Sequence, residues 1–128
     1  MKLWGGRFAE GPSEVFDRFG RSLHFDKELV DVDLRGSIAH AKGLEKIGIL
    51  TAGECASLVE ALEGMRAEAA IPSFFENCEE EDVHTVVIGK LKQRLGADLA
   101  DKIHTGRSRN DQVSLDVRLW LRDRIDNA

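Results

Sequence analysis

Residues 27–69 read KELVDVDLRGSIAHAKGLEKIGIL followed by TAGECASLVEALEGMRAEA, and this stretch decides the fold. Its apolar residues recur at steps of three and four, which is the spacing of one face of an α-helix. We predict a first helix from about Lys27 to Ile47, with Asp26 as its N-cap and Gly48 as its C-cap. The sequence Thr51-Ala52-Gly53-Glu54 is a capping box that opens a second helix. Two helices joined by so tight a turn form a helical hairpin.

Two glycines, Gly36 and Gly43, lie inside the first predicted helix. Glycine in a helix interior costs about 1 kcal/mol relative to alanine. Interior glycine often marks the close approach of another backbone, and a tolerated weakness is the alternative explanation.

Three more helical segments are predicted after a loop around Pro72. No strand-like alternation persists anywhere in the chain, so the predicted class is all-α. The segments are a helix from about Glu80 to Leu95, a short turn over Asp98–Lys102, and a last helix that begins near Ser108 or Arg109.

The last predicted helix is apolar on two faces, and this decides the predicted domain organisation. Val113, Val117, Trp120 and Leu121 share one face, and Leu115 and Leu119 lie nearly opposite. A helix of this kind is expected to be buried on two sides, and the chain has no further elements to cover it. We therefore expect the sequence to end within the first long helix of a helical bundle. The predicted domains are an amino-terminal helical-hairpin domain, residues 1–105, and the truncated start of the bundle, residues 106–128.

Composition limits the classes of partner and the compartment. The formal net charge of −5 argues against a general nucleic-acid surface. No apolar run approaches the roughly 20 residues that a membrane span needs, and the first residues lack the apolar core of a signal peptide. We predict no nucleic acid, no membrane and a cytoplasmic location. Cys55 and Cys78 form no metal or disulfide pattern, and Cys55 is expected to be a small buried residue.

The strongest candidate for chemistry is His104–Gln112, which reads HTGRSRNDQ. It contains no apolar side chain and runs into a helix start, where free amide groups and the helix dipole favour an anion. Arg107 and Arg109 offer guanidinium donors to a carboxylate, and Asn110 can donate and accept. We predict that this segment grips a small anionic substrate. The alternative is that the segment is an ordinary loop between two helices, with Ser108 as the N-cap of the second helix.

Two further polar groups precede predicted helices. Glu79–Asp82 lies at a helix start, where the dipole favours acids, and His84 is either a pH-sensitive group or an exposed first-turn residue. The contiguous acidic run does not place metal ligands on one helical face, so we predict no metal. Ser22 can satisfy the backbone locally, and Asp26 already has its predicted role as an N-cap.

Taken together, these segments resemble argininosuccinate lyase, a family of the fumarase/aspartase superfamily that includes the delta crystallins of bird lenses. The likeness covers nearly the whole chain, in order and with matching spacing. Its most specific block is His104–Gln112 followed by Leu119-Trp120-Leu121. The other matching segments are Leu3–Phe8, Asp33 with Gly36-Ser37, Gly43–Lys46 and Glu81–His84.

The resemblance implies a reaction and an assembly. Family enzymes split argininosuccinate into arginine and fumarate by β-elimination, a step of arginine biosynthesis, without metal or organic cofactor. They are homotetramers whose active sites combine three subunits along a long-helix bundle. The catalytic histidine and the catalytic serine lie in later segments of the family, so the resemblance implies no catalytic acid or base here. The chain alone is therefore expected to be inactive.

By position, the resemblance also implies roles for individual residues. Ser22 and Asn110 resemble direct substrate-binding residues, and Arg109 resembles a further donor to the substrate. Asp26 and Asp82 resemble acidic contacts to the arginine half of the substrate. The residues with supporting roles are His84, Arg107 and Ser108.

One departure from the family pattern leaves alternatives open. Where the family often carries a glutamate, four residues after the histidine of the Glu-Asp-x-His segment, this chain has Ile88. The change is either neutral at the surface or weakens the support of His84. Besides an enzyme part, a catalytically silent structural protein of the delta-crystallin kind and a helical assembly module remain as alternatives.

Overall fold

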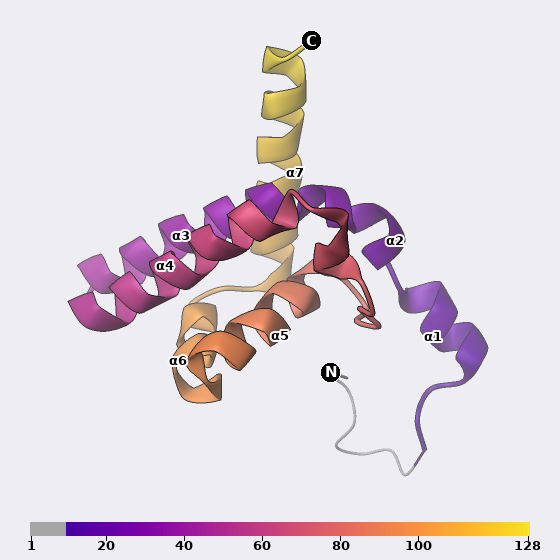
Figure 1. Cartoon of the computed structure of the whole chain (residues 1–128), viewed down its shortest axis with the longest axis horizontal. Helices are drawn as coiled ribbons and strands as arrows, with labels where there is room; N and C mark the ends of the chain where they lie inside the picture. The colour runs from indigo at the N-terminus through magenta and orange to yellow at the C-terminus, as the bar shows by residue number, and fades with distance from the viewer. Residues whose placement is uncertain (1–9) are drawn as a thin grey trace.

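The computed structural model describes residues 10–128, and all regular structure in that range is helical (Figure 1). The all-α prediction is confirmed. The segment Leu3–Phe8, one part of the resemblance, lies outside the described residues. The helices are α1 (Glu14–Gly20), α2 (Leu23–Asp26), α3 (Val30–Lys46), α4 (Ala52–Ala69), α5 (Val83–Leu95), α6 (Ala97–Asp101) and α7 (Arg109–Asp126). Short 3-10 turns cover Lys27–Leu29, Pro72–Phe75 and Lys102–His104.

The predicted hairpin is formed by α3 and α4, which lie side by side (Figure 1). Gly48 lies just after α3 with φ of 80°, a conformation that glycine adopts readily at a helix end. The Thr51 hydroxyl accepts from the Glu54 amide at 3.1 Å, and the Glu54 carboxylate accepts from the Thr51 amide at 3.0 Å. The capping box is therefore confirmed, and it starts α4 immediately after the turn.

The start of α3 differs from the prediction. The α-helix begins at Val30, because Lys27–Leu29 forms a 3-10 turn. Asp26 makes no capping hydrogen bond to that turn. The N-cap prediction for Asp26 is wrong, because its carboxylate is directed to a partner far away in the sequence. The short helices α1 and α2 were also not predicted; neither is long enough to show a clear apolar period.

The hydrophobic core lies where α3, α4 and α5 pack together, with α6 beside the end of α5. Cys55 belongs to this core and is 3% exposed, as expected for a small buried residue. Ile88 is also buried here, so the neutral-surface explanation of its change is wrong. The fully buried apolar side chains are Leu34, Ala41, Leu58, Leu62, Met65, Val83 and Ala100.

Side-chain caps fix the starts of α5 and α7. Asp82 accepts from the Thr85 amide at 2.7 Å, so α5 begins at Val83 and the acidic run before it stays outside the helix. The predicted start at Glu80 is therefore too early. Ser108 and Asp111 form a capping box that starts α7 at Arg109, as predicted.

Helix α7 crosses α3 and then extends away from the other helices (Figure 1). Its buried face is polar, since Gln112 and Asp116 lie against α3 while both apolar faces remain partly exposed. At the crossing, a Cβ on Gly36 would lie 3.1 Å from the Leu115 side chain, whereas nothing lies within 4 Å of that position at Gly43. Gly36 therefore gives room to a side chain of α7 and not to another backbone, and Gly43 meets no neighbour, so the predicted backbone approach is found at neither glycine. None of the described helices has the length and apolar character of a membrane span.

Candidate functional site

Most of the predicted site residues line two cavities that share Asp82, but Asn110 lines neither of them. One cavity, of about 540 Å³, is lined by the side chains of Ser22, Asp26, Asp82 and His84, together with Val113, Val117 and Trp120 of α7. The other, of about 470 Å³, is lined by Asp82, Lys92, His104, Arg107 and Arg109. We call them the serine cavity and the arginine cavity.

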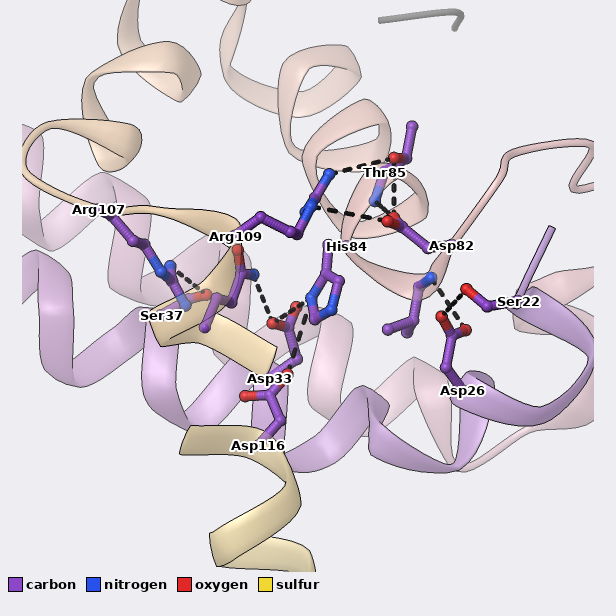
Figure 2. A network of polar contacts seen from close by, with 12 residues as sticks. Ser22, Asp26, Asp33, Ser37, Asp82, His84, Thr85, Arg107, Arg109 and Asp116 are labelled. Carbon is purple, nitrogen blue, oxygen red and sulfur yellow. Dashed lines mark hydrogen bonds and ion pairs between the residues drawn. The ribbon is translucent and has the colours of Figure 1, made fainter. Parts of the chain in front are cut away.

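Ser22 and Asp26 are joined at one wall of the serine cavity (Figure 2). The Ser22 hydroxyl donates to Asp26 Oδ2 at 2.6 Å, and the Val83 amide donates to Asp26 Oδ1 at 3.1 Å. Burial raises the pKa of Asp26, and the Ser22 hydrogen bond opposes that shift. The contact with Val83 explains why Asp26 does not cap its own helix. It ties α2 to the start of α5 and holds a carboxylate beside the cavity.

Asp82 lies between the cavities and contacts Arg109 (Figure 2). Its Oδ1 accepts from the Thr85 amide and from the Thr85 hydroxyl at 2.8 Å. Its Oδ2 lies 3.6 Å from Arg109 Nε, and Arg109 also donates to the Thr85 hydroxyl at 3.5 Å. The contacts to Arg109 are long, so its guanidinium keeps donors for another anion. Asp82 and Arg109 thus offer opposite charges side by side.

His84 is 4% exposed, which excludes the exposed first-turn alternative. Its Nδ1 lies in hydrogen-bond contact with Asp33 Oδ1 at 2.8 Å, and Gln112 Nε2 donates to the same oxygen at 2.5 Å. His84 Nδ1 also lies 3.7 Å from Asp116 Oδ2 (Figure 2). Sequence reasoning gave no role to Asp33, Asp116 or Gln112. The separate helices that carry Asp33, His84 and Asp116 meet only in the folded chain.

The segment His104–Gln112 does not act as one surface. Arg107 Nη1 turns inward and donates to the Ser37 hydroxyl at 2.9 Å. Ser108 is the N-cap, and its hydroxyl accepts from the Asn110 amide at 3.1 Å. Asn110 itself is exposed at the first turn of α7. The structure therefore separates the predicted substrate-binding residues by direction, with Asn110 facing outward and Arg109 facing Asp82.

His104 lines the arginine cavity. Partial desolvation and the nearby charges of Arg107 and Arg109 lower the pKa of His104. The cavity also contains ionic pairs, since Lys92 Nζ lies 2.8 Å from Asp101 Oδ1. Arg109 is the guanidinium of this cavity that also contacts Asp82.

Within residues 10–128, three side chains of the types that can ligate a metal lie close together. One ligand atom each from Asp33, His84 and Asp116 lies within 4.8 Å of the other two. The sequence prediction of no metal was based on the acidic run Glu79–Asp82. None of the three clustered residues belongs to that run. The amide N–H of Gln112 is directed at Asp33 Oδ1, which favours a hydrogen-bonded cluster over a cation at that oxygen.

A protein-family model described as "Lyase" matches residues 6–128. The chain belongs to this lyase family. An argininosuccinate lyase from Solibacter usitatus is 63% identical over 123 residues, which cover 96% of this chain and 26% of that protein. An argininosuccinate lyase from Methylococcus capsulatus is 49% identical over 126 residues, and a probable argininosuccinate lyase from Schizosaccharomyces pombe is 43% identical over 126 residues; each alignment covers 98% of this chain and 27% of the relative. The resemblance is confirmed, and the chain spans about a quarter of these lyases' length.

Ile88, where the resemblance led us to expect a glutamate, lines the arginine cavity and lies in the core. It contributes an apolar side chain to the wall of the cavity that Arg107 and Arg109 also line.

Proposed function

We propose that this chain is the amino-terminal part of an enzyme that splits argininosuccinate into arginine and fumarate. The observation that carries the proposal is 63% identity to an argininosuccinate lyase over 96% of the chain. The chain would contribute substrate-binding residues, with no cofactor. The catalytic acid and base would come from other segments of the protein.

The arrangement of charges fits such a substrate. In argininosuccinate a guanidino group joins an amino-acid end, which has one carboxylate, to a succinyl end, which has two. Asp26 and Asp82 both line the serine cavity, where two carboxylates suit a guanidino group. Arg109, beside Asp82 and at the first turn of α7, suits a substrate carboxylate.

The elimination needs charge stabilisation at that carboxylate. A base takes the proton from the succinyl carbon, the carbon–nitrogen bond breaks as the carbon–carbon double bond forms, and an acid protonates the departing nitrogen. Negative charge builds on the carboxylate in the intermediate, where positioned donors lower the barrier. Arg109, at the positive end of the α7 dipole, is the group of this chain suited to that task.

A homotetramer is part of the same proposal. Helix α7 leaves apolar side chains partly exposed on both faces and extends away from the hairpin (Figure 1). Such a helix is suited to a bundle built with other segments or subunits. The exposed residues are Val113, Leu115, Val117, Leu121 and Ile125.

The test is a chimera in which this chain replaces the matching quarter of the Solibacter usitatus relative. Fumarate release from argininosuccinate is followed by ultraviolet absorbance. We expect release by the chimera and none by the 128-residue chain alone. A folded chimera without release would contradict the proposal and favour a catalytically silent structural protein of the delta-crystallin kind. Release by the chain alone would contradict the assignment of the acid and base to other segments.

The substitution Asn110→Ala tests the substrate-binding role most directly. Its side chain is exposed at the start of α7, so we expect little effect on folding and a clear loss of kcat/KM. Asn127→Ala, at the other end of the same helix, is the matched control and is expected to leave kinetics unchanged. If both variants had the same kcat/KM, the substrate-binding role of Asn110 would be contradicted.

A further inference from the structure

The predicted roles do not explain one buried cluster, which is formed by Asp33, His84, Gln112 and Asp116. Asp33 and Asp116 are fully buried, and His84 and Gln112 are 4% and 6% exposed. Asp33 Oδ2 and both oxygens of Asp116 have no hydrogen-bond donor among the described residues. Two ionised carboxylates in this setting would repel each other and lack solvation.

The hydrogen bonds indicate which carboxyl is ionised. Asp33 Oδ1 accepts from Gln112 Nε2 and lies 2.8 Å from His84 Nδ1, and an ionised Asp33 would require that nitrogen to donate. Asp116 receives no such donors, so its protonated form, which can donate to Asp33, removes the repulsion. Burial and the neighbouring charge of Asp33 raise the pKa of Asp116 to about 8, in agreement with this geometry.

The buried cluster uses Nδ1 of the His84 imidazole, so the other ring nitrogen, Nε2, is available to the serine cavity. Arg107, which donates to Ser37, is the nearby cation on the side of α3 and α7. His84 lines the cavity that also contains Ser22, Asp26 and Asp82. With Nδ1 protonated and bound to Asp33, the Nε2 of a neutral His84 is an acceptor.

We propose that Asp33 and Asp116 share one proton, and that Asp33 is a positioning residue that fixes His84 as the Nδ1–H tautomer beside the serine cavity. The role of this histidine in catalysis rests on the proposed function. The tautomer of His84 does not rest on the proposed function, so the tautomer and the catalytic role can be tested separately.

The first measurement needs no substitution. The 128-residue chain is labelled with ¹⁵N-histidine, and long-range ¹H–¹⁵N spectra report which imidazole nitrogen carries the proton. We expect His84 to be the neutral Nδ1–H tautomer near neutral pH. A His84 protonated at Nε2 alone, or at both nitrogens, would overturn the proposal.

Three substitutions then distinguish the contributions of the Asp33 and Asp116 carboxyl groups to the His84 tautomer in the same spectra. Asp33→Asn removes the carboxylate that holds Nδ1–H, and we expect His84 to shift towards the Nε2–H form. Asp116→Asn mimics the protonated acid and is expected to keep the Nδ1–H form. Asp31→Asn, on the exposed side of α3, is the matched control. Loss of the Nδ1–H form in Asp116→Asn would overturn the shared proton.

A cation bound by Asp33, His84 and Asp116 is the competing explanation, and it predicts different results. Zn²⁺ or Mn²⁺ would then bind at one ion per chain, change the His84 signals and raise the melting temperature, and Asp116→Asn would abolish these effects. That outcome would overturn the proposal. We expect no saturable effect of either ion on His84.

Kinetics of the chimera test whether Asp33 acts through His84. Partners that orient metal-bound histidines are typically worth about tenfold or more, and Asp33 is assigned the same orienting role without a metal. We expect Asp33→Asn to lower kcat/KM about tenfold alone, and by much less in a His84→Asn background, because coupled residues are not additive. Equal losses in both backgrounds would overturn the positioning role. An unsubstituted chimera that releases no fumarate would contradict the proposed function, while the tautomer spectra would still decide the inference.

Discussion

The replacement of Asp116 by asparagine should remove a specific pH dependence of folding stability. In the folded chain Asp116 is fully buried beside Asp33, and its pKa is raised from 3.8 to about 8. A group whose folded-state pKa is raised stabilises the fold while it stays protonated, and this contribution falls as pH rises from the unfolded pKa to the folded pKa. The window for Asp116 therefore runs from about pH 4 to about pH 8.

Asp33 does not act in that window. Burial opposes its ionisation, but the hydrogen bonds with His84 and with the Gln112 amide outweigh burial and lower its pKa. A lowered carboxyl pKa gives stability that is lost only as pH falls below the unfolded value. Between about pH 5 and pH 7, Asp33 is ionised in both states, and the slope from this pair belongs to Asp116.

The size of the effect follows from one proton. With a folded pKa near 8, Asp116 stays neutral in the folded chain and is ionised in the unfolded chain across this range. Each pH unit then lowers the free energy of unfolding by about 1.36 kcal/mol. The wild-type chain should therefore lose about 2.5 kcal/mol between about pH 5 and pH 7 relative to Asp116→Asn.

Urea unfolding of the two chains at matched pH values provides the measurement. The difference between them cancels the contributions of groups that the substitution does not touch. Asp31→Asn, which removes an exposed carboxylate on α3, should show a constant difference from wild type over the same range. A pH-independent difference for Asp116→Asn would refute the reasoning, since it would mean that Asp116 has the same protonation state in both the folded and unfolded chains.

Three further outcomes are expected. Gly43→Ala, at an exposed α3 position with nothing within 4 Å of the added Cβ, should raise the free energy of unfolding by about 1 kcal/mol in urea unfolding. Gly36→Ala should raise the free energy of unfolding clearly less in the same assay, because its Cβ would lie 3.1 Å from Leu115. An equal increase would mean that the Leu115 side chain moves aside without cost. His104 should titrate below its ordinary 6.5 in NMR, because partial desolvation and nearby cations lower its pKa, and Arg107→Gln should raise the midpoint. An unchanged midpoint would contradict the assigned contribution of that arginine.

Sequence reasoning succeeded where structure depends on neighbours in the chain. The capping boxes at Thr51 and Ser108 are each closed by an acid three residues later, so their partners are fixed by local geometry. The same reasoning failed for Asp26, because the amide that it binds belongs to Val83 and comes close only after α5 packs against the rest.

The candidate site was predictable in kind and only partly in arrangement. The polar composition of His104–Gln112 indicated an anion-binding segment, but composition did not show that Arg107 turns inward to Ser37 while Asn110 faces outward. The direction of each side chain follows from the cap at Ser108, which sets where α7 begins and therefore which of its positions meet α3.

What the sequence determined by itself is the all-helical class, the hairpin, the local caps and the resemblance to a lyase family, since each depends on residue types at short or fixed spacing. Only the tertiary structure decided that Asp33, His84 and Asp116 form one buried cluster. Their helices α3, α5 and α7 are distant in the chain, and no local pattern distinguishes a buried aspartate from a solvated one. Packing decides that difference, because it removes water and leaves the carboxyl groups to satisfy each other.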